Sequence, residues 1–236
     1  YEILRCLVGS EMCIRDRITR VGGEKFSYPV PTYQALKGIY ESCYWKPTFT
    51  WVIDELRVMN PIERQSKGIR PIMYNNGKND LSIYTYLSDV CYQVRAHFEW
   101  NEHRPDLEKD RNENKHYAIA KRMLERGGRR DIFLGTRECQ GYIEPCIFGL
   151  GKGHYDDVSS LDLGLMEHGI TYADENGKGV MQERFWHPVM QNGKICFCRP
   201  EECEIVRDIH PQKMKTFTLG ETVSDCDDLY REVIQE

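Results

Sequence analysis

The chain lacks a hydrophobic run long enough to cross a membrane. Gly, Pro, Tyr or charged residues interrupt each apolar stretch of the 236 residues before it reaches the ~18 to 20 residues that a spanning helix needs. The first residues also lack the basic start, long apolar middle and small-residue cleavage site of a secretory signal. We therefore expect a cytoplasmic protein without a membrane partner.

The cysteines lack the spacing of a disulfide framework or a zinc finger. The nearest approach to a metal cluster is Cys196-x-Cys198 with Cys203, which has neither a second CxxC pair nor paired histidines at zinc-finger spacing. Cysteine is also a common small buried residue in reducing compartments. The acidic residues form no DxD or clustered carboxylate–histidine motif that would indicate a metal-dependent nuclease. We expect free thiols, no metal and no cofactor.

Charge is unevenly distributed along the chain. The whole chain has a net charge of -5, whereas residues 151–236 alone hold 9 Lys and Arg against 17 Asp and Glu, a net of -8 that leaves +3 for residues 1–150. A polyanion should therefore bind the N-terminal part. An acidic face that only keeps the protein in solution would give the same asymmetry.

Residues 1–17, YEILRCLVGSEMCIRDR, do not match the sequence that follows. They show no sustained strand alternation, and CLVGSEMCIRDR resembles translated adapter sequence that is found joined to unrelated metagenomic proteins. We expect residues 1–17 to be a non-native leader that replaces the first strand of the fold.

The elements after this segment follow the order helix, strand, strand, helix, strand. Helical or alternating apolar spacing predicts these elements, and the glycines of Gly127-Gly128 end the second helix. The predicted elements are helix 33–43 with Thr32 as its cap, a strand from Phe49, a strand over 90–100, a helix over about 115–126, and an extended segment after Asp131. With a first strand added, this is the βαββαβ plan of an α+β, ferredoxin-like (RRM-like) domain. We place this domain in residues 18–150 and a small antiparallel β region in residues 151–236.

The start of the second helix carries residues suited to RNA chemistry. Lys115 and His116 lie in its first turn, where the helix dipole attracts phosphate and keeps an imidazole neutral. RNA cleavage can use the substrate's own 2′-OH, so it needs only a proton-transfer group and a cation. Lys115, His116 and Tyr44 can supply these, and Arg126, Arg129 and Arg130 are candidates for RNA binding.

The same residues also have simpler explanations. His116 could cap the helix, Lys115 could be a solvated charge, and Tyr44 could be a packing aromatic. Arg129 and Arg130 could form a surface ion pair with Asp131. The residues alone therefore indicate only an RNA binder.

Three longer motifs carry a resemblance to a known family. They are GGEKFSYPVPTYQALKGIYESCYWKPTF, FEWNEHRPDLEKDRNENKHY and GGRRDIFLGTRECQGYIEP. Over residues 19–207 the chain resembles the Cas-five proteins of type I-C CRISPR systems, which belong to the RAMP superfamily. The family's active-site tyrosine corresponds to Tyr44, and its Lys-His pair corresponds to Lys115 and His116.

The resemblance implies a metal-independent endoribonuclease. Such proteins cut the CRISPR repeat hairpin of pre-crRNA to leave a 2′,3′-cyclic phosphate and a 5′-OH. They then stay bound to the crRNA 5′ handle beside the backbone and large subunits of Cascade. In other CRISPR subtypes the corresponding protein is a non-catalytic scaffold that binds the handle, so a pure binding subunit is the alternative.

Overall fold

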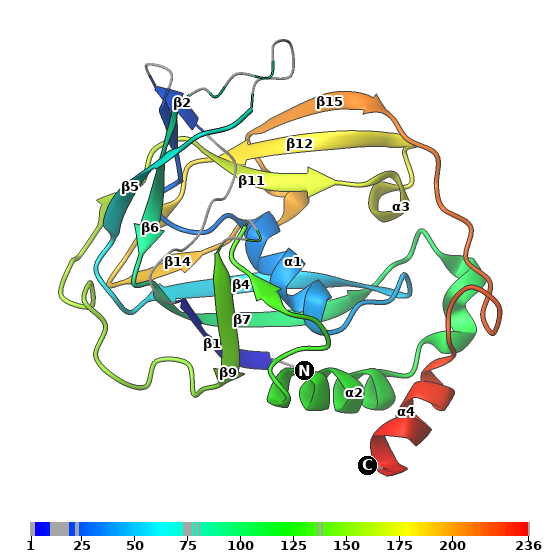
Figure 1. Cartoon of the computed structure of the whole chain (residues 1–236). Helices are drawn as coiled ribbons and strands as arrows, with labels where there is room; N and C mark the ends of the chain where they lie inside the picture. The colour runs from blue at the N-terminus through cyan, green and yellow to red at the C-terminus, as the bar shows by residue number, and fades with distance from the viewer. Residues whose placement is uncertain are drawn as a thin grey trace.

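The computed structural model is a mixed α+β structure with several small sheets, and it describes residues 3–9, 19–21, 24–72, 77, 79, 81–135, 137 and 139–235 (Figure 1). The helices are α1 (Tyr33–Cys43), η1 (Pro105–Asp110), α2 (Glu113–Glu125), α3 (Ala173–Asn176), η2 (Pro200–Glu202) and α4 (Cys226–Gln235). The strands are β1 (Ile3–Gly9), β2 (Thr19–Val21), β3 (Glu24–Phe26), β4 (Phe49–Val58), β5 (Glu63–Ile69), β6 (Ser82–Ser88), β7 (Cys91–Trp100), β8 (Ile132–Phe133), β9 (Gln140–Pro145), β10 (Leu161–Asp162), β11 (Met166–Thr171), β12 (Val180–Trp186), β13 (Val189–Met190), β14 (Lys194–Cys196) and β15 (Ile205–Pro211).

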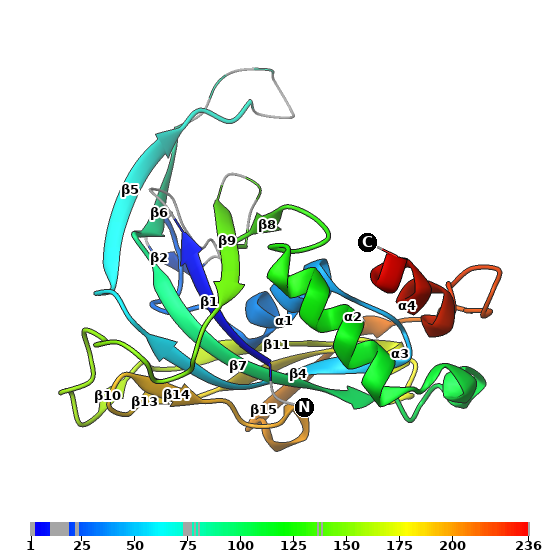
Figure 2. The same ribbon diagram turned by 90° about the horizontal axis from the view of Figure 1, so that it is seen from below.

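The largest sheet has the strand order β14-β4-β7-β1-β9-β8, and all of its neighbouring strands are antiparallel. Helix α1 packs on β4 and α2 packs on β9, and the two helices contact one another beside this sheet (Figure 2). The predicted first helix is confirmed from Tyr33 to Cys43, and the Thr32 side chain accepts a hydrogen bond from the Ala35 N–H as its cap. The second helix begins two residues earlier than predicted.

Strand β1 corrects our expectation for the N-terminus. We expected the first core strand to be missing, but Ile3–Gly9 pairs with β7 on one side and with β9 on the other. We expected no strand there because residues 1–17 show no sustained alternation and resemble adapter sequence. Residues 10–17 of the expected leader lie outside the described residues, and the non-native origin of residues 1–17 stays a prediction.

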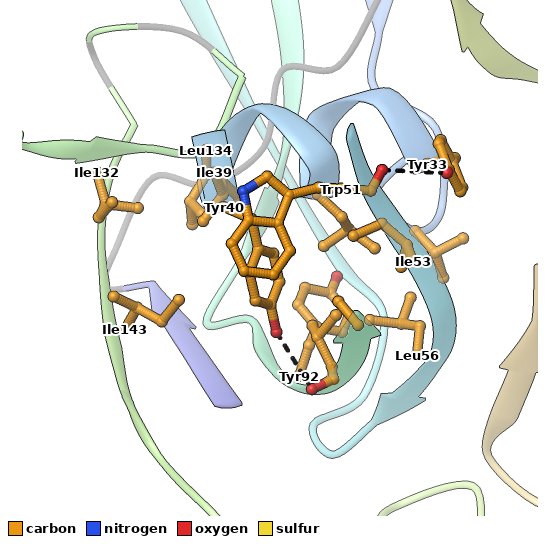
Figure 3. Packing of buried hydrophobic residues seen from close by; sticks show 14 of the residues in the cluster. Tyr33, Ile39, Tyr40, Trp51, Ile53, Leu56, Tyr92, Ile132, Leu134 and Ile143 are labelled. Atoms are coloured by element: carbon orange, nitrogen blue, oxygen red, sulfur yellow. Dashed lines mark hydrogen bonds between the residues drawn. The ribbon is translucent and has the colours of Figure 1, made fainter. Parts of the chain in front are cut away.

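Aromatic side chains from α1 and β4 form the centre of the core. Trp51 is 0% exposed and Tyr40 is 1% exposed, and their rings lie 5.0 Å apart between centroids. The hydroxyl of Tyr40 donates to the Val94 carbonyl at 3.4 Å, and that of Tyr33 donates to the Trp51 carbonyl at 3.4 Å (Figure 3). These bonds satisfy the polar ends of large buried rings, which fixes α1 against the sheet.

A second, three-stranded antiparallel sheet with the order β11-β12-β15 covers the other side of α1 (Figure 1). It matches the small antiparallel sheet predicted for residues 151–236. The C-terminal part also contributes β14, which pairs with β4 at the edge of the largest sheet. The two parts of the chain therefore share one hydrogen-bonded sheet.

Two features were not predicted. Strands β5 and β6 pair along their whole length and join β2 and β3 in a four-stranded sheet. Helix α4 lies against α2 at the C-terminal end of the chain (Figure 2). Within the described residues, no helix combines the length and the apolar character needed to cross a bilayer.

Candidate active site

Tyr44 is held at the end of α1. Its backbone N–H donates to the Tyr40 carbonyl at 2.9 Å, and the chain then leaves the helix in an extended conformation. The Trp51 indole N–H donates to the Tyr44 carbonyl at 2.7 Å, which links the end of the helix to β4. The side chain points inward, since Tyr44 is only 2% exposed.

His116 lies in the first turn of α2, as expected from the sequence. The Asn112 side chain accepts a hydrogen bond from the Lys115 N–H at 3.3 Å and caps the helix. The His116 side chain is fully buried, and the rings of Phe49 and Trp100 meet it edge-on at 5.3 and 5.5 Å between centroids. The aromatic contacts hold the imidazole plane in one orientation.

The structure brings Tyr44 and His116 into direct contact. The Tyr44 hydroxyl oxygen lies 2.8 Å from His116 Nδ1, and His116 Nε2 lies 2.7 Å from the backbone carbonyl oxygen of Asp110. A carbonyl oxygen only accepts, so Nε2 carries the proton of the neutral ring. Nδ1 then holds the lone pair and accepts the Tyr44 O–H.

Burial shifts both pKa values toward neutral side chains. Burial lowers the pKa of His116 below its ordinary value of 6.5, although the Asp110 carbonyl and carboxylate oppose the shift. Burial likewise raises the pKa of Tyr44, and the Asp110 charge adds to that effect. At neutral pH the pair therefore consists of a protonated tyrosine and a neutral imidazole. The sequence predicted the neutral imidazole from the helix dipole, whereas burial is the largest cause.

Asp110 organises the surroundings of His116, and the sequence did not single it out. Its buried carboxylate accepts hydrogen bonds from Lys46 Nζ at 2.9 and 3.0 Å, from Thr48 Oγ1 at 2.7 Å and from the Cys226 N–H at 2.7 Å. Burial alone would raise the pKa of Asp110, but the bonds from Lys46 and Thr48 outweigh it and lower that pKa. Asp110 thus stays charged, with Oδ2 3.7 Å from His116 Nε2.

One sequence signal could have indicated this network. Lys46 and Thr48 alternate with Trp45 and Pro47 directly before the strand predicted from Phe49, so both lie near the Tyr44 end of α1. Asp110, in contrast, lies among many charges in HRPDLEKDRNEN. No periodicity distinguishes the one buried carboxylate of that loop from its solvated neighbours.

Lys115 is adjacent to His116 in sequence, but its ammonium is directed to α4. Lys115 Nζ forms an ion pair with Asp227, and this contact raises the pKa of Lys115. Helix α4 approaches from the acidic C-terminal part of the chain, and its first N–H is the one that donates to Asp110. In this conformation Lys115 is engaged by a carboxylate.

A pocket of about 270 Å³ opens next to Tyr44 between α2 and α4. Arg126 and Arg129 line it on one side, and Leu229, Glu232 and Val233 of α4 line it on the other. Arg130 is exposed beside Arg129 but is not among the lining residues. Two of the three predicted RNA-binding arginines therefore share a pocket with Tyr44.

The arrangement can move a proton and stabilise a negative charge. A group that donates a proton to the Tyr44 oxygen would let Tyr44 pass its own proton to His116 Nδ1. The resulting imidazolium would lie beside the Asp110 carboxylate. Cations for a phosphate are available from Lys115, Arg126 and Arg129 once the acidic residues of α4 no longer face them.

Comparison with known proteins places the chain in one family. The family model described as "CRISPR-associated protein (Cas_Cas5)", Cas_Cas5d, matches residues 4–198. A curated relative from Thermus thermophilus, named "CRISPR pre-crRNA endoribonuclease Cas5d", is 27% identical over 167 residues, which cover 66% of this chain and 68% of the relative. A relative of the same name from Mannheimia succiniciproducens is 28% identical over 207 residues, covering 73% of this chain and 84% of its own length.

A solved structure agrees with these matches. A crystal structure of a CRISPR-associated protein superimposes with a TM-score of 0.70 and 35% sequence identity, over 88% of this chain and 96% of the other. The match to the family extends through the elements that carry Tyr44, Asp110 and His116. The chain therefore belongs to the Cas5d family of CRISPR-associated proteins.

Proposed function

We propose that this protein is a metal-independent endoribonuclease that cuts CRISPR repeat hairpins in pre-crRNA. The single observation that carries the proposal is the 2.8 Å contact between the Tyr44 hydroxyl and His116 Nδ1, with the His116 proton fixed on Nε2 by the Asp110 carbonyl. The names of the two curated relatives give the substrate class. The chemistry needs no metal, because RNA supplies the 2′-OH nucleophile.

In the proposed reaction, Tyr44 and His116 act as a relay. The 2′-OH of the nucleotide before the scissile phosphate gives its proton to the Tyr44 oxygen, while Tyr44 gives its own proton to His116 Nδ1. The 2′ oxygen attacks the phosphorus and the bond to the 5′ oxygen breaks. Water protonates that oxygen to give the 5′-OH, and the hydroxide so formed is neutralised when His116 releases its extra proton through Tyr44. The products are a 2′,3′-cyclic phosphate and a 5′-OH. The high pKa of Tyr44 fits this role, since it never needs to exist as a free phenolate.

Helix α4 must move for RNA to reach these groups. Tyr44 and His116 are buried, and the Lys115 ammonium is held in an ion pair with Asp227. A phosphate that replaces Asp227 would let Lys115 stabilise the charge that develops during attack. Arg126 and Arg129 line the pocket through which the sugar-phosphate backbone of the RNA would approach Tyr44.

We also propose that the core of the chain has the ferredoxin-like arrangement. This proposal is supported by the strand order β4-β7-β1-β9 in an antiparallel sheet, and by the chain positions of α1 between β1 and β4 and of α2 between β7 and β9. The product crRNA would stay bound by its 5′ handle, and the protein would then serve as a subunit of Cascade beside its backbone and large subunits.

The alternative is a non-catalytic scaffold that only binds the 5′ handle. The closed position of α4 favours it, because a permanently covered Tyr44 and His116 could not reach a phosphodiester. RNA would then bind elsewhere on the N-terminal part. The intact contact between Tyr44 and His116 supports the enzyme instead.

One experiment separates the two functions. The purified protein is incubated with an end-labelled CRISPR repeat hairpin in EDTA, and the termini of the products are analysed. The enzyme predicts cleavage with a 2′,3′-cyclic phosphate end. A hairpin with a 2′-deoxy nucleotide before the scissile phosphate should bind normally and resist cleavage. If the deoxy hairpin is cut at an undiminished rate, water is the nucleophile and the relay is wrong. If neither hairpin is cut but both bind, the scaffold stands.

A further inference from the structure

Three side chains from the C-terminal part of the fold meet in a second cluster that the proposed reaction does not use. They are His168 of β11, Cys198 just after β14 and Cys203 just after η2, and their ligand atoms all lie within 4.8 Å of one another. His168 is 0% exposed and Cys203 is 8% exposed. The cysteines alone match no zinc motif in the sequence, and the fold supplies the missing histidine from a distant strand.

The separation of the two thiols fits a tetrahedral ion. The sulfur atoms of Cys198 and Cys203 lie 3.8 Å apart. Zinc binds a thiolate sulfur at about 2.3 Å in tetrahedral geometry, which places two sulfur ligands about 3.8 Å from each other. A disulfide would require them to approach to about 2.05 Å. The two sulfurs therefore already have the separation that a shared tetrahedral ion requires.

The His168 ring is oriented as a metal ligand usually is. Its Nε2 lies 3.0 Å from the Cys198 carbonyl oxygen, so Nε2 carries the proton and Nδ1 holds the lone pair. Histidine ligands commonly donate their other ring N–H to a backbone carbonyl in this way. Tyr33 stacks on the ring at 4.3 Å between centroids, and Trp186 meets it edge-on at 5.5 Å.

Arg184 is the other charged group at the cluster. Its Nε donates to His168 Nδ1 at 3.4 Å, and its side chain also interacts with the Cys203 thiol. A cation at Nδ1 would replace the long Arg184 bond, and the guanidinium would then donate to the thiolates.

We propose that His168, Cys198 and Cys203 bind one thiophilic divalent cation, best matched by Zn²⁺, with the fourth position open to water. Two thiolates and a neutral imidazole suit zinc in donor type and in geometry. The cation would join β11, the segment after β14 and η2, so its role would be structural. Asp110, His116 and Cys226 also lie within 4.8 Å of one another, but the Asp110 carboxylate there is filled by Lys46 and Thr48.

The test uses the full-length protein and does not depend on RNA cleavage. Protein stripped by a chelator is titrated with Co²⁺, whose tetrahedral thiolate complexes show intense visible and near-ultraviolet bands. We expect one equivalent to bind, Zn²⁺ to displace it, and Zn²⁺ to raise the melting temperature by about 5 °C, because the ion binds only the folded chain. Zn²⁺ should also protect Cys198 and Cys203 from alkylation, as mapped by mass spectrometry.

Matched variants complete the test. Cys198→Ser and Cys203→Ser should each weaken Co²⁺ binding at least about 100-fold and abolish the sulfur charge-transfer band of the removed ligand. Cys196→Ser is the control, because Cys196 is exposed and its thiol faces Glu55 instead. No stoichiometric metal binding by the wild-type chain, unchanged alkylation of both cysteines, or a Cys198–Cys203 disulfide in freshly isolated protein would each overturn the proposal. The alkylation result decides the matter even if a variant fails to fold.

Discussion

The molecule contains two fully buried histidines that are anchored in the same way but have different neighbours. His116 and His168 are each 0% exposed, and each directs Nε2 to a backbone carbonyl, of Asp110 at 2.7 Å and of Cys198 at 3.0 Å. The anchoring leaves Nδ1 with the lone pair in both. At His116 that lone pair meets the Tyr44 hydroxyl. At His168 it accepts from Arg184, and two thiols lie within 4.8 Å of a ring nitrogen.

The difference shows that the group beside Nδ1 determines which chemistry a buried imidazole can perform. A hydroxyl beside the imidazole can exchange a proton with a substrate. Thiols beside the imidazole can instead bind a cation together with the ring nitrogen. The cover of the two sites differs as well. Helix α4 lies over the His116 site (Tyr44, Asp110, Lys115 and His116), while the rings of Tyr33 and Trp186 pack against His168.

The largest expected effect is on the cleavage rate, and it follows from removing the histidine beside Tyr44. His116→Ala should slow repeat cleavage by roughly 10²- to 10⁴-fold with little loss of hairpin affinity, since it removes the proton acceptor and leaves the binding surface. Single-turnover kinetics and filter binding measure the two quantities. Lys115→Ala should impair both, because the ammonium would touch the phosphate before and during attack. Equal losses of rate and affinity in His116→Ala would assign the residue to folding or binding instead.

A pH profile tests the protonation state of His116. Burial lowers the pKa of His116 below 6.5, and only the neutral ring accepts a proton, so the single-turnover rate should stay flat from pH 8 down through 6.5. It should fall only below the lowered pKa. The unfolded chain takes up the proton near pH 6.5 and the folded chain does not, so this group makes the fold less stable as pH falls below that value. A rate that already falls tenfold between pH 7.5 and 6.5 would contradict a buried neutral imidazole.

Release of α4 should increase activity by a moderate factor. Asp227→Asn removes the carboxylate that engages Lys115, and we expect cleavage at subsaturating hairpin to become about 3- to 10-fold faster, because an exposed ion pair restrains the helix only weakly. Asp228→Asn is the matched control, because Asp228 pairs with Arg231 within the same helix. A chain that ends at residue 224 should show at least the same gain. If neither Asp227→Asn nor the shortened chain cleaves faster, α4 is not a barrier to RNA.

The smallest expected effects concern the arginines beside the His116 site. Arg129→Ala and Arg130→Ala should each weaken hairpin binding and reduce the slope of log affinity against log salt by about 1. Arg207→Ala on β15 is the control, since it removes the same charge from the acidic part of the chain. Unchanged slopes would exclude Arg129 and Arg130 from the RNA surface. They would also weaken the prediction that RNA binds residues 1–150 and not the acidic residues 151–236.

The sequence predicted the elements whose stabilising pattern is local. The bounds of α1 follow from Thr32 and the apolar spacing of the helix, and the alternation of β4 and β7 is equally clear. β1 was missed because residues 1–17 lack sustained alternation and resemble adapter sequence. β5 was missed because its side chains are mostly exposed, which leaves no apolar pattern to detect.

The same limit applies to the site. Tyr44, Lys115 and His116 were indicated by helix ends and by resemblance, and the structure brings Tyr44 and His116 together. Asp110 and Asp227 were not indicated, because a carboxylate reveals its partner only when the fold brings distant segments together. The catalytic roles of the residues, and the division of the chain at residues 17 and 150, stay predictions.

The central position of β1 also constrains the order in which the chain can assemble. Its hydrogen-bonding partners are Cys91–Trp100 and Gln140–Pro145, so β1 pairs with segments that are synthesised much later than itself. Long-range pairing of this kind is slow, because the chain loses the entropy of closing large loops before stabilising contacts form. During synthesis the strand has both edges unpaired. We expect the nascent chain to depend on chaperones until β9 has emerged. Only then can β1 pair on both of its edges, with β7 and with β9.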